Sequence, residues 1–238
     1  MIKLNGIAAS YSDEILLIGL EIAPFPTRRS LETSIPLRAG AIYIGYSYEP
    51  RPIKATFALH GKSAERNAEL AHALAVWASG DKAQQLIVDE TPDRYYLAET
   101  ESIDEIDYAE QFPELRIQFK CMNPFAYSLE SREALPGDTF YYHGDVETEP
   151  VIQYIPAADV QGATWRLNDR QMEITEQQTI PSGHTILVDC ANKIVTDNGD
   201  STIMKHLSLY SDWLRIRPGA NTFQGAEGSK LQYRECYL

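Results

Sequence analysis

The chain has 238 residues, of which 44% are hydrophobic and 23% are charged, and this balance excludes a wholly disordered protein. The longest aliphatic run, Ile15–Leu20, is far shorter than the roughly 18 residues of a membrane-spanning helix, and the start of the chain has no apolar stretch with a small-residue cleavage site, so we expect neither membrane insertion nor a signal peptide. The formal net charge of −13 argues against nucleic-acid binding, because an acidic surface repels phosphate groups.

The segment Pro24–Pro52 comes first along the chain, and its pattern predicts an irregular excursion. Prolines interrupt it repeatedly, and a long connection of this kind inside a domain is usually functional or disordered. Its tyrosines argue against disorder, and its arginines, in an acidic chain, predict contacts with an acidic surface of a neighbouring subunit or partner. The alternative is that these arginines are solvated loop residues. The candidate interface residues are Arg28, Arg29, Arg38, Tyr43, Tyr46, Tyr48 and Arg51.

Residues Ser63–Ser79 form the one segment that clearly predicts a helix. Ser63 is a suitable N-cap, because its hydroxyl can accept a hydrogen bond from a free backbone N–H of the first turn. We expect Trp77 to be a core anchor and Gly80 to end the helix as a glycine just beyond its C-terminus. The predicted apolar stripe, at the spacing i, i+3, i+4 and i+7, consists of Leu70, Ala73, Leu74 and Trp77.

Four segments around this helix have the β-branched and aromatic composition of strands. In the last of them, apolar and polar residues alternate, so one face is expected to be buried and to include Cys121. The residues Thr91–Asp93 predict a hairpin loop between the second and third segments. The four predicted strands are Ala55–Gly61, Gln85–Glu90, Arg94–Glu101 and Leu115–Cys121.

The second half of the chain predicts short strands separated by turn signals, which is typical of a β-sandwich or jelly roll. Asp197–Asp200 contains Asn-Gly, which favours a tight hairpin turn. The region Leu129–Pro150 lacks a clear apolar period and predicts a domain boundary, with domains at residues 1–133 and 134–238. The predicted strands are Val151–Ile155, Thr164–Leu167, Thr185–Cys190, Lys193–Thr196, Ser201–Lys205, Trp213–Arg217, Asn221–Gln224 and Leu231–Tyr237.

Residue patterns that would support catalysis, a metal or a cofactor are not found in the sequence. There is no phosphate-binding glycine loop and no nucleophile elbow, the five histidines are scattered, and the three cysteines lack a disulfide or metal pattern. Asp197–Asp200 also lacks the alternating oxygen ligands of a calcium loop. We therefore expect a binding or structural protein with no catalytic residue, metal or cofactor.

One acidic stretch, Asp89–Glu114, is dense enough to raise the question of glycoside hydrolysis by paired carboxylates. Most acidic proteins contain two carboxylates close together in sequence, so the stretch is better interpreted as a solvated or partner-facing surface. If it faces a partner, that partner should be basic.

Several segments together resemble the distal tail proteins of long-tailed, non-contractile bacteriophages. The hairpin after the helix and the Phe-x-Cys-x-x-Pro-Phe stretch are the most distinctive of them. One departure is the turn at Leu37–Ala41, where the family often has Pro-Gly-x-Asp-Gly. The segments that carry the resemblance are Pro26–Arg29, Arg38–Ala41, Arg51–Ile53, Leu70–Trp77, Leu86–Ala98, Ile117–Tyr127, Val188–Cys190, Thr196–Gly199 and Leu214–Thr222.

The resemblance implies a mainly β fold, with an N-terminal β-sandwich that carries one α-helix and forms a hexameric ring. It implies a second, galectin-like or carbohydrate-module-like jelly roll outside that ring. The implied partners are further copies of the chain in a homohexamer, the tail tube protein, the tail hub and receptor-binding proteins. The implied location is the distal end of the phage tail in the virion, after synthesis in the host cytoplasm, with no enzymatic activity.

A carbohydrate-binding module that contacts host cell-wall glycans is the alternative function. Four aromatic residues of the second half could stack on sugar rings, although strand aromatics are more often part of a core. A glycan hydrolase is a third possibility, and the acidic stretch is its one support. The four aromatic residues are Tyr154, Trp165, Tyr210 and Trp213.

Overall fold

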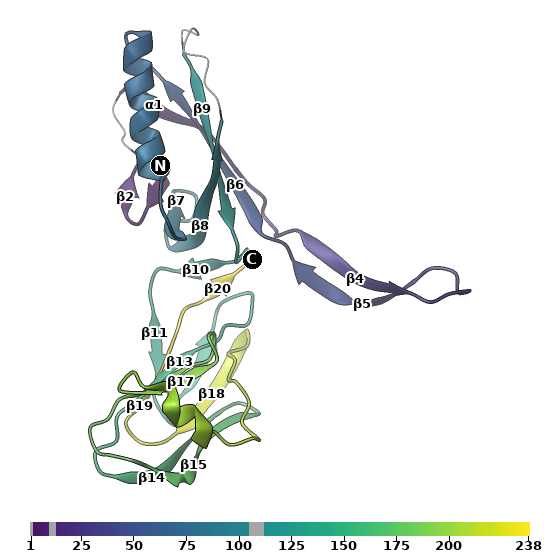
Figure 1. Ribbon diagram of the computed structural model, residues 1–238, viewed down its shortest axis with the longest axis vertical. Helices are drawn as coiled ribbons and strands as arrows, with labels where there is room; N and C mark the ends of the chain where they lie inside the picture. The colour runs from purple at the N-terminus through teal and green to yellow at the C-terminus, as the bar shows by residue number, and fades with distance from the viewer. Residues whose placement is uncertain (1, 10–12, 105–111) are drawn as a thin grey trace. The chain divides into compact units, whose positions relative to one another are not determined.

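The computed structural model describes residues 2–9, 13–104 and 112–238, and it divides the chain into two compact units (Figure 1). The first unit contains residues 1–127 and Leu238, and the second contains residues 128–237. This division lies six residues before the predicted one at 133/134. The reason is that strand β11 (Arg132–Ala134) pairs with β19 (Ser229–Tyr233) and so belongs entirely to the second unit.

The first unit is built on an antiparallel sheet, and the predicted strands of this half are confirmed to within a few residues. The strand β8 joins two groups of strands: its first part pairs with β7, and its last part pairs with β9. The order is β2 (Ile7–Ala8), β1 (Ile2–Leu4), β7 (Gln84–Val88), β8 (Arg94–Ile103), β9 (Glu114–Cys121), β6 (Arg51–Leu59) and β3 (Ile15–Ile22).

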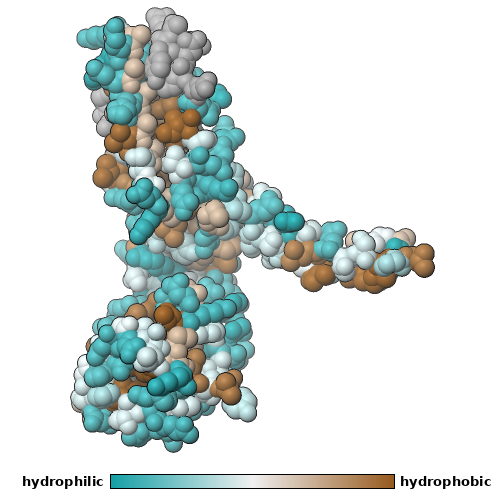
Figure 2. Space-filling view, viewed as in Figure 1, coloured by the Kyte–Doolittle hydropathy of each residue, from teal (hydrophilic) through white to brown (hydrophobic). Residues whose placement is uncertain are grey.

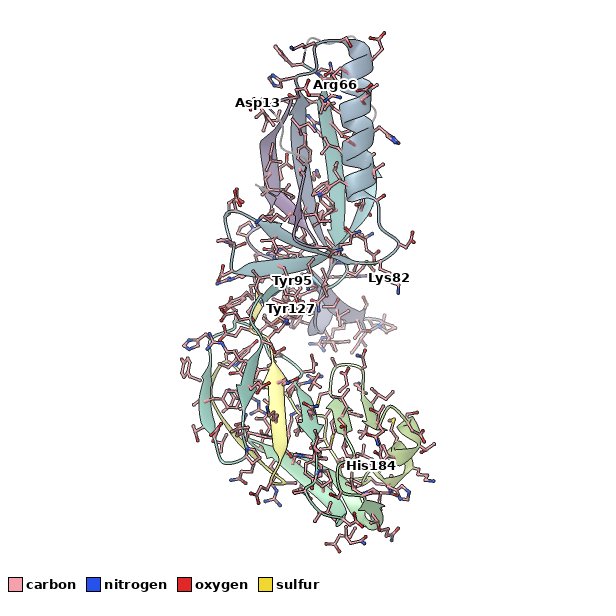
Figure 3. The ribbon with its side chains drawn as sticks, turned by 90° about the vertical axis from the view of Figure 1, so that its left-hand side faces the viewer. Asp13, Arg66, Lys82, Tyr95, Tyr127 and His184 are labelled. Carbon is pink, nitrogen blue, oxygen red and sulfur yellow. The ribbon has the colours of Figure 1, made fainter. Side chains whose placement is uncertain are left out.

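The alternation in β9 sets the core of the first unit. Leu115, Ile117, Phe119 and Cys121 are all buried, as predicted, and the residues between them are exposed or half-buried. The loop Thr91–Asp93 joins β7 and β8 as an antiparallel pair, which also agrees with the prediction. A further strand of this region is β10 (Ala126–Ser128), where Tyr127 stacks on Tyr95 of β8 with ring centroids 5.7 Å apart (Figure 3).

The predicted helix is α1 (Ala64–Ala78), and the Ser63 side chain accepts a hydrogen bond from the Arg66 amide at its start. Arg66 also binds the Glu14 carboxylate, with Nη2 2.7 Å from Oε2. Leu70 and Leu74 of the predicted stripe are buried, but Ala73 is exposed and Trp77 only half-buried. The buried residues of the helix are Asn67, Leu70, Ala71, Leu74 and Ala78.

Trp77 and Gly80 also differ from their predicted roles. Trp77 lies half-buried at the margin of the core, where its ring meets Phe119 edge-on and its Nε1 donates to the Ile7 carbonyl at 3.1 Å. Gly80 does not have the positive φ of a left-handed helix cap. A Cβ at Gly80 would meet only the movable amide end of the Gln84 side chain, so the structure gives no steric reason for the glycine.

The segment Pro24–Pro52, predicted to be irregular, is a regular hairpin of β4 (Arg28–Ser34) and β5 (Ala41–Tyr48). The prolines misled the prediction, because all of them stand outside the two strands: before β4, in the tip, or after β5. Proline removes a backbone donor only where it stands, so it limits the strands without breaking them.

The second unit is a sandwich of two antiparallel sheets, which confirms the mainly β fold with a second β-sandwich. Its core lies between the sheets and contains Trp165, Phe223 and Leu231. The first sheet is β11, β19, β13 (Val151–Tyr154), β16 (Ile186–Asp189) and β17 (Ile194–Asp197). The second is β12 (Thr139–Tyr142), β18 (Gly219–Gly225), β14 (Val160–Leu167) and β15 (Arg170–Ile180).

Four predictions in this half are wrong in detail. Residues 129–150 are no linker, since they contain β11 and β12 with the buried Tyr142. Ser201–Lys205 is part of a 3₁₀ helix, η1 (Ser201–His206), because the Asp200 carboxylate accepts the Thr202 amide and starts a helical turn. Trp213–Arg217 forms only an isolated bridge at Ile216, and the short strand β20 (Cys236–Tyr237) is separate from β19.

Candidate assembly surface

The hairpin β4–β5 places most of the candidate interface residues on one element. Arg28 pairs with Tyr48 and Ser30 with Tyr46, whereas after a bulge Glu32 pairs with Tyr43. In a regular strand, residues 43 and 46 would point to opposite faces, because side chains alternate. The bulge adds one residue to β5 and restores the phase, so Tyr43, Tyr46 and Tyr48 share a face with Arg28.

Arg28 is the centre of this aromatic face. Its guanidinium carbon lies 4.3 Å from the ring centre of Tyr46 and 4.5 Å from that of Phe25. Its Nη2 donates a hydrogen bond of 2.9 Å to the Tyr48 hydroxyl, and that bond raises the pKa of Arg28. The positive charge is thus held against aromatic rings, which favours cation–π contact and keeps the face preorganised.

The base of the hairpin is anchored to the first unit by Tyr48 and Arg51. The Tyr48 ring meets the Phe125 ring edge-on at 5.0 Å. Arg51 is only 1% exposed, and it donates to the Pro124 carbonyl at 3.1 Å and to the Ala23 carbonyl at 2.9 Å. Arg51 was predicted to contact a partner, and its burial makes that prediction wrong: it clamps the chain on both sides of the hairpin.

The rest of the hairpin is exposed on both faces. Every residue of β4 is exposed, and large apolar side chains stand in water along both strands and at the tip (Figure 2). A two-stranded hairpin is marginally stable on its own, and exposed apolar patches usually mark interaction sites. The exposed apolar residues of the hairpin are Leu31, Ile35, Leu37, Tyr43, Ile44 and Tyr46.

The tip of the hairpin is a tight turn that presents Leu37. The Arg38 amide donates to the Ile35 carbonyl at 3.2 Å, and Leu37 has a φ of 66° with its side chain fully in solvent. A left-handed φ is unusual for leucine and is often found at functional positions. The side chains of Arg38 beside it, and of Arg29 on the face opposite Arg28, make no ion pair or hydrogen bond within the described part of the chain.

A second exposed feature, β3, is not among the predicted interface residues. This strand ends the order of the sheet, so its outer backbone groups have no partner among the described strands, and its Leu16 and Ile18 are exposed. Open strand edges pair readily with other chains. The signal was present in the aliphatic run Ile15–Leu20, which sequence reasoning used only to exclude a membrane helix.

The acidic stretch Asp89–Glu114 is divided among separate places in the first unit. Glu101 pairs with Lys120 at 2.9 Å, and this interaction lowers the pKa of the carboxyl group. Glu114 lies 3.8 Å from Arg116, on β9. Glu105, Asp107 and Glu110 lie outside the described residues. Glu101 and Glu114 therefore each lie beside a basic side chain on the surface of the first unit.

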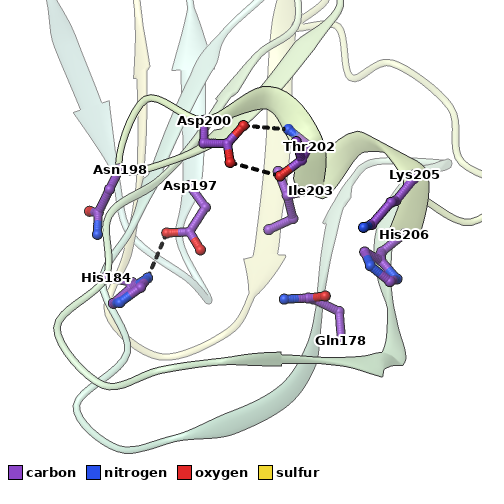
Figure 4. Close-up of a pocket in the computed structure, with 9 residues that line it drawn as sticks. All are labelled: Gln178, His184, Asp197, Asn198, Asp200, Thr202, Ile203, Lys205 and His206. Carbon is purple, nitrogen blue, oxygen red and sulfur yellow. Dashed lines mark hydrogen bonds and ion pairs between the residues drawn. The ribbon is translucent and has the colours of Figure 1, made fainter.

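A polar pocket of about 340 Å³ lies in the second unit beside the turn Asp197–Asp200 (Figure 4). His184 Nδ1 lies 2.8 Å from an Asp197 carboxylate oxygen, and the Asn198 side chain accepts the Thr185 amide at 3.0 Å. Asn198 and Gly199 have positive φ, as the predicted tight turn requires, but η1 follows where the second strand was expected. Within the described residues, no three histidine, cysteine or acidic side chains form a metal-binding group.

Two of the four aromatic residues proposed to stack on sugars, and the cysteines of the second unit, are buried. Trp165 is fully buried and donates to the Ser229 hydroxyl at 2.8 Å, and Tyr154 is buried beside it, so neither can stack on a sugar. Cys190 and Cys236 are buried free thiols, and burial raises the pKa of each to about 12. Across the described residues, no helix has the length and apolar character needed to cross a membrane.

Two family models match the chain, one in each unit. A model described as a phage tail protein RIFT-related domain matches residues 17–121. A model described as the C-terminal domain of a siphovirus-type tail component matches residues 143–237. The two matches together leave only residues 1–16, 122–142 and 238 uncovered.

Individual relatives agree with these models. The distal tail protein of Bacillus phage SPP1 is 25% identical over an alignment of 160 residues that covers 62% of this chain and 60% of that protein, so this chain spans about three fifths of the relative. The crystal structure of SPP1 Dit, described as a paradigm of the hub adsorption apparatus in phages that infect Gram-positive bacteria, has a TM-score of 0.83 at 16% identity and covers 100% of this chain and 98% of its own. A chain of the activated phage p2 baseplate with Sr has a TM-score of 0.50 at 10% identity, covering 92% and 90% of the two chains. These structures share the fold.

Proposed function

We propose that six copies of this chain form a closed ring that joins the tail tube to the baseplate hub. The basis is that the chain belongs to the distal tail protein family of siphoviruses. As a member of that family, the chain is a structural protein of the virion at the tip of the tail. The ring, its number of subunits and its connecting role are the proposal. We also propose that the protein has no enzymatic activity, since the relatives that it matches are tail and baseplate components.

The hairpin β4–β5 is the observation that carries this proposal. It leaves the sheet of the first unit and exposes apolar side chains on both faces, so it is stable only if something covers it. In a ring, one surface of each copy contacts a different surface of the next copy. Such heterologous contacts generate a closed ring when the rotation from copy to copy returns to the first copy. We assign the hairpin of each copy to the first unit of its neighbour.

Charge supports a neighbouring copy as the surface that receives the hairpin. The chain has a formal net charge of −13, so a neighbouring copy offers acidic surface to Arg29 and Arg38. Complementary charge of this kind guides docking and register more than it adds affinity. The tail tube protein, the hub and receptor-binding proteins are the proposed further partners, on the faces of the ring.

The test compares the oligomeric state of the full chain with that of a variant of the aromatic face. Native mass spectrometry, sedimentation and negative-stain images at tens of micromolar are expected to show a ring of six for the unchanged chain. The double variant Tyr43→Ser, Tyr46→Ser is expected to shift the chain to monomer while its unfolding transition stays unchanged, because both side chains are exposed.

The matched control is Val76→Ser, which removes an exposed apolar side chain from α1 and should leave the ring intact. A chain that stays monomeric in several salt concentrations contradicts the ring. Loss of the ring in the control as well as in the tyrosine variant contradicts the role of the hairpin.

A further inference from the structure

The turn after η1 presents two large apolar side chains to solvent. Leu209 is 99% exposed and Tyr210 is 95% exposed. Single exposed apolar residues are ordinary on protein surfaces, but two adjacent and almost fully exposed ones form a knob with no cover from the described chain. We call the pair Leu209 and Tyr210 the apolar knob.

The knob stands on a turn that the rest of the unit holds in place. The Ser211 amide closes the turn on the Ser208 carbonyl at 3.0 Å. On either side of the turn, the Ser208 and Asp212 amides donate to the Glu173 and Gln171 carbonyls of β15 at 2.9 and 2.7 Å. The Glu173 amide also donates to the Ser211 hydroxyl at 3.0 Å. The backbone is therefore preorganised, and burying the knob in a partner requires little further ordering of the backbone.

The same unit contains an apolar pocket of about 480 Å³. Leu135 and Pro136 form one wall, and Gly225 and Gly228 are among the other residues that line the pocket. A Cβ at Gly225 would lie 2.6 Å from the Trp165 ring, and Gly228 has a φ of +90°, so neither position accepts a larger residue without strain. The volume lies within the range of small-molecule pockets, which is ample for two side chains.

The register of the strands places the knob at one edge of the second sheet. Gly225 of β18 pairs with Trp165 of β14, and Trp165 pairs with Met172 of β15. These three residues form one row across the sheet. The turn of residues 208–211 lies beyond β15 at the level of Met172, because its flanking amides bind the carbonyls on either side of that residue.

The pocket lies at the other end of the same row. The Gly137 amide donates to the Phe223 carbonyl at 2.8 Å, so the chain just before β12 continues along β18 towards Gly225. Leu135 and Pro136 therefore flank Gly225 on the side away from β14. The row runs from the pocket, through Gly225, Trp165 and Met172, to the knob.

We propose that the second unit makes a head-to-tail contact with a second copy of the chain, in which the knob of one copy fills the pocket of the next. A knob and a pocket at opposite edges of one sheet are complementary between copies placed side by side in the same orientation. Such a contact is heterologous, and it repeats around a ring. Glu227 at the pocket and Lys205 before the knob have opposite charges and make no ion pair within the described chain, while Lys230, which also lines the pocket, is already paired with Glu133.

The contact is small, and in this respect it rests on the proposed ring for its strength. Two side chains cover far less than the roughly 1,200 Å² of a stable interface. Where the first units already hold copies together, the effective concentration of the second units reaches the millimolar range and a weak contact is occupied. The knob and pocket then link the second units of neighbouring copies to one another.

Cysteine cross-linking between full-length chains tests this proposal. Chains with Tyr210→Cys are mixed with chains with Leu135→Cys at high concentration and oxidised mildly. The native cysteines are buried, so they should not contribute. We expect mixed dimers at roughly tenfold the yield of the control mixture, given the effective concentration in the contact. The control mixture combines Tyr210→Cys with Leu187→Cys, an exposed position on β16 in the other sheet.

The outcomes separate this proposal from the proposed function. A yield no greater than that of the control overturns the knob contact, even if a ring forms. Dimers linked mainly between two Tyr210→Cys chains also overturn it, because they indicate a two-fold contact. The same cysteine pair is also introduced into the Tyr43→Ser, Tyr46→Ser chain, at a concentration where sedimentation without oxidant shows only monomer. Mixed dimers formed under these conditions support the knob contact independently of the ring. A monomeric chain that gives no mixed dimers overturns both proposals.

Discussion

Replacing Arg51 by methionine should destabilise the first unit without acting through any partner. The guanidinium is buried and supplies two hydrogen bonds, to the carbonyls of Ala23 and Pro124. Methionine keeps much of the aliphatic volume but supplies no donor. The variant therefore leaves two carbonyls at the base of the hairpin without their charged partner.

The size of the effect follows from those two bonds. A hydrogen bond from a charged donor contributes roughly 1.5–3 kcal/mol, and part of the loss is recovered by water or by small movements of the chain. We expect the free energy of unfolding of the first unit to fall by about 3 kcal/mol. That change corresponds to a population of the opened unit about 100-fold larger.

Hydrogen exchange measured by mass spectrometry can follow the first unit alone. The strands β6 and β9 are each paired with a neighbour on both sides, so exchange of their amides reports on opening of the whole unit. We expect exchange in peptides from β6 and β9 to accelerate by about 100-fold in Arg51→Met. Peptides from the second unit should exchange at their original rate and act as an internal control.

Arg29→Met is the matched variant, because it removes the same charge from an exposed position on β4. A surface change of this kind should alter stability by less than about 0.5 kcal/mol. The reasoning is refuted if Arg51→Met leaves the exchange of β6 and β9 unchanged.

Two further predictions concern the cores of the two units. Trp165→Phe should lower the free energy of unfolding of the second unit by about 2 kcal/mol, because it leaves a small cavity and removes the hydrogen bond to Ser229. Urea denaturation measures this loss, and hydrogen exchange should locate it in the second unit alone. Burial raises the thiol pKa from 9.0 to about 12 for Cys121, Cys190 and Cys236. Their contribution to stability is complete below pH 9 and is lost as the pH rises through 12, so the unfolding midpoint should fall over that range, and less steeply when one cysteine is replaced by alanine. A midpoint that does not change with pH contradicts the burial of the thiols.

The sequence alone determined the local elements whose signals are strong. The alternation in Leu115–Cys121 predicted one buried face, and the cap at Ser63 placed the start of α1 correctly. The Asn-Gly turn at residues 198–199 was also predicted, because positive φ angles restrict it to few residue types. In each case the deciding interaction spans only a few residues along the chain.

Tertiary structure decided which faces are covered. Arg28 and Arg51 look alike in the sequence, yet Arg28 lies exposed over Tyr46 and Arg51 is buried between Ala23 and Pro124. The carbonyls that hold Arg51 are 28 and 73 residues away, and no local pattern records such partners. Likewise, the bulge opposite Leu31 places Tyr43 beside Tyr46 and exists only in the paired strands.

The function itself depended on both kinds of information. The family resemblance lies in the order of short motifs along the chain, which the sequence contains in full. The surfaces that assemble are different, because an exposed strand or turn has the same apolar composition as a buried one. Leu209 and Tyr210 show the reason: burial is a property of the neighbours that the fold brings to a residue, and for these two residues the described chain brings none.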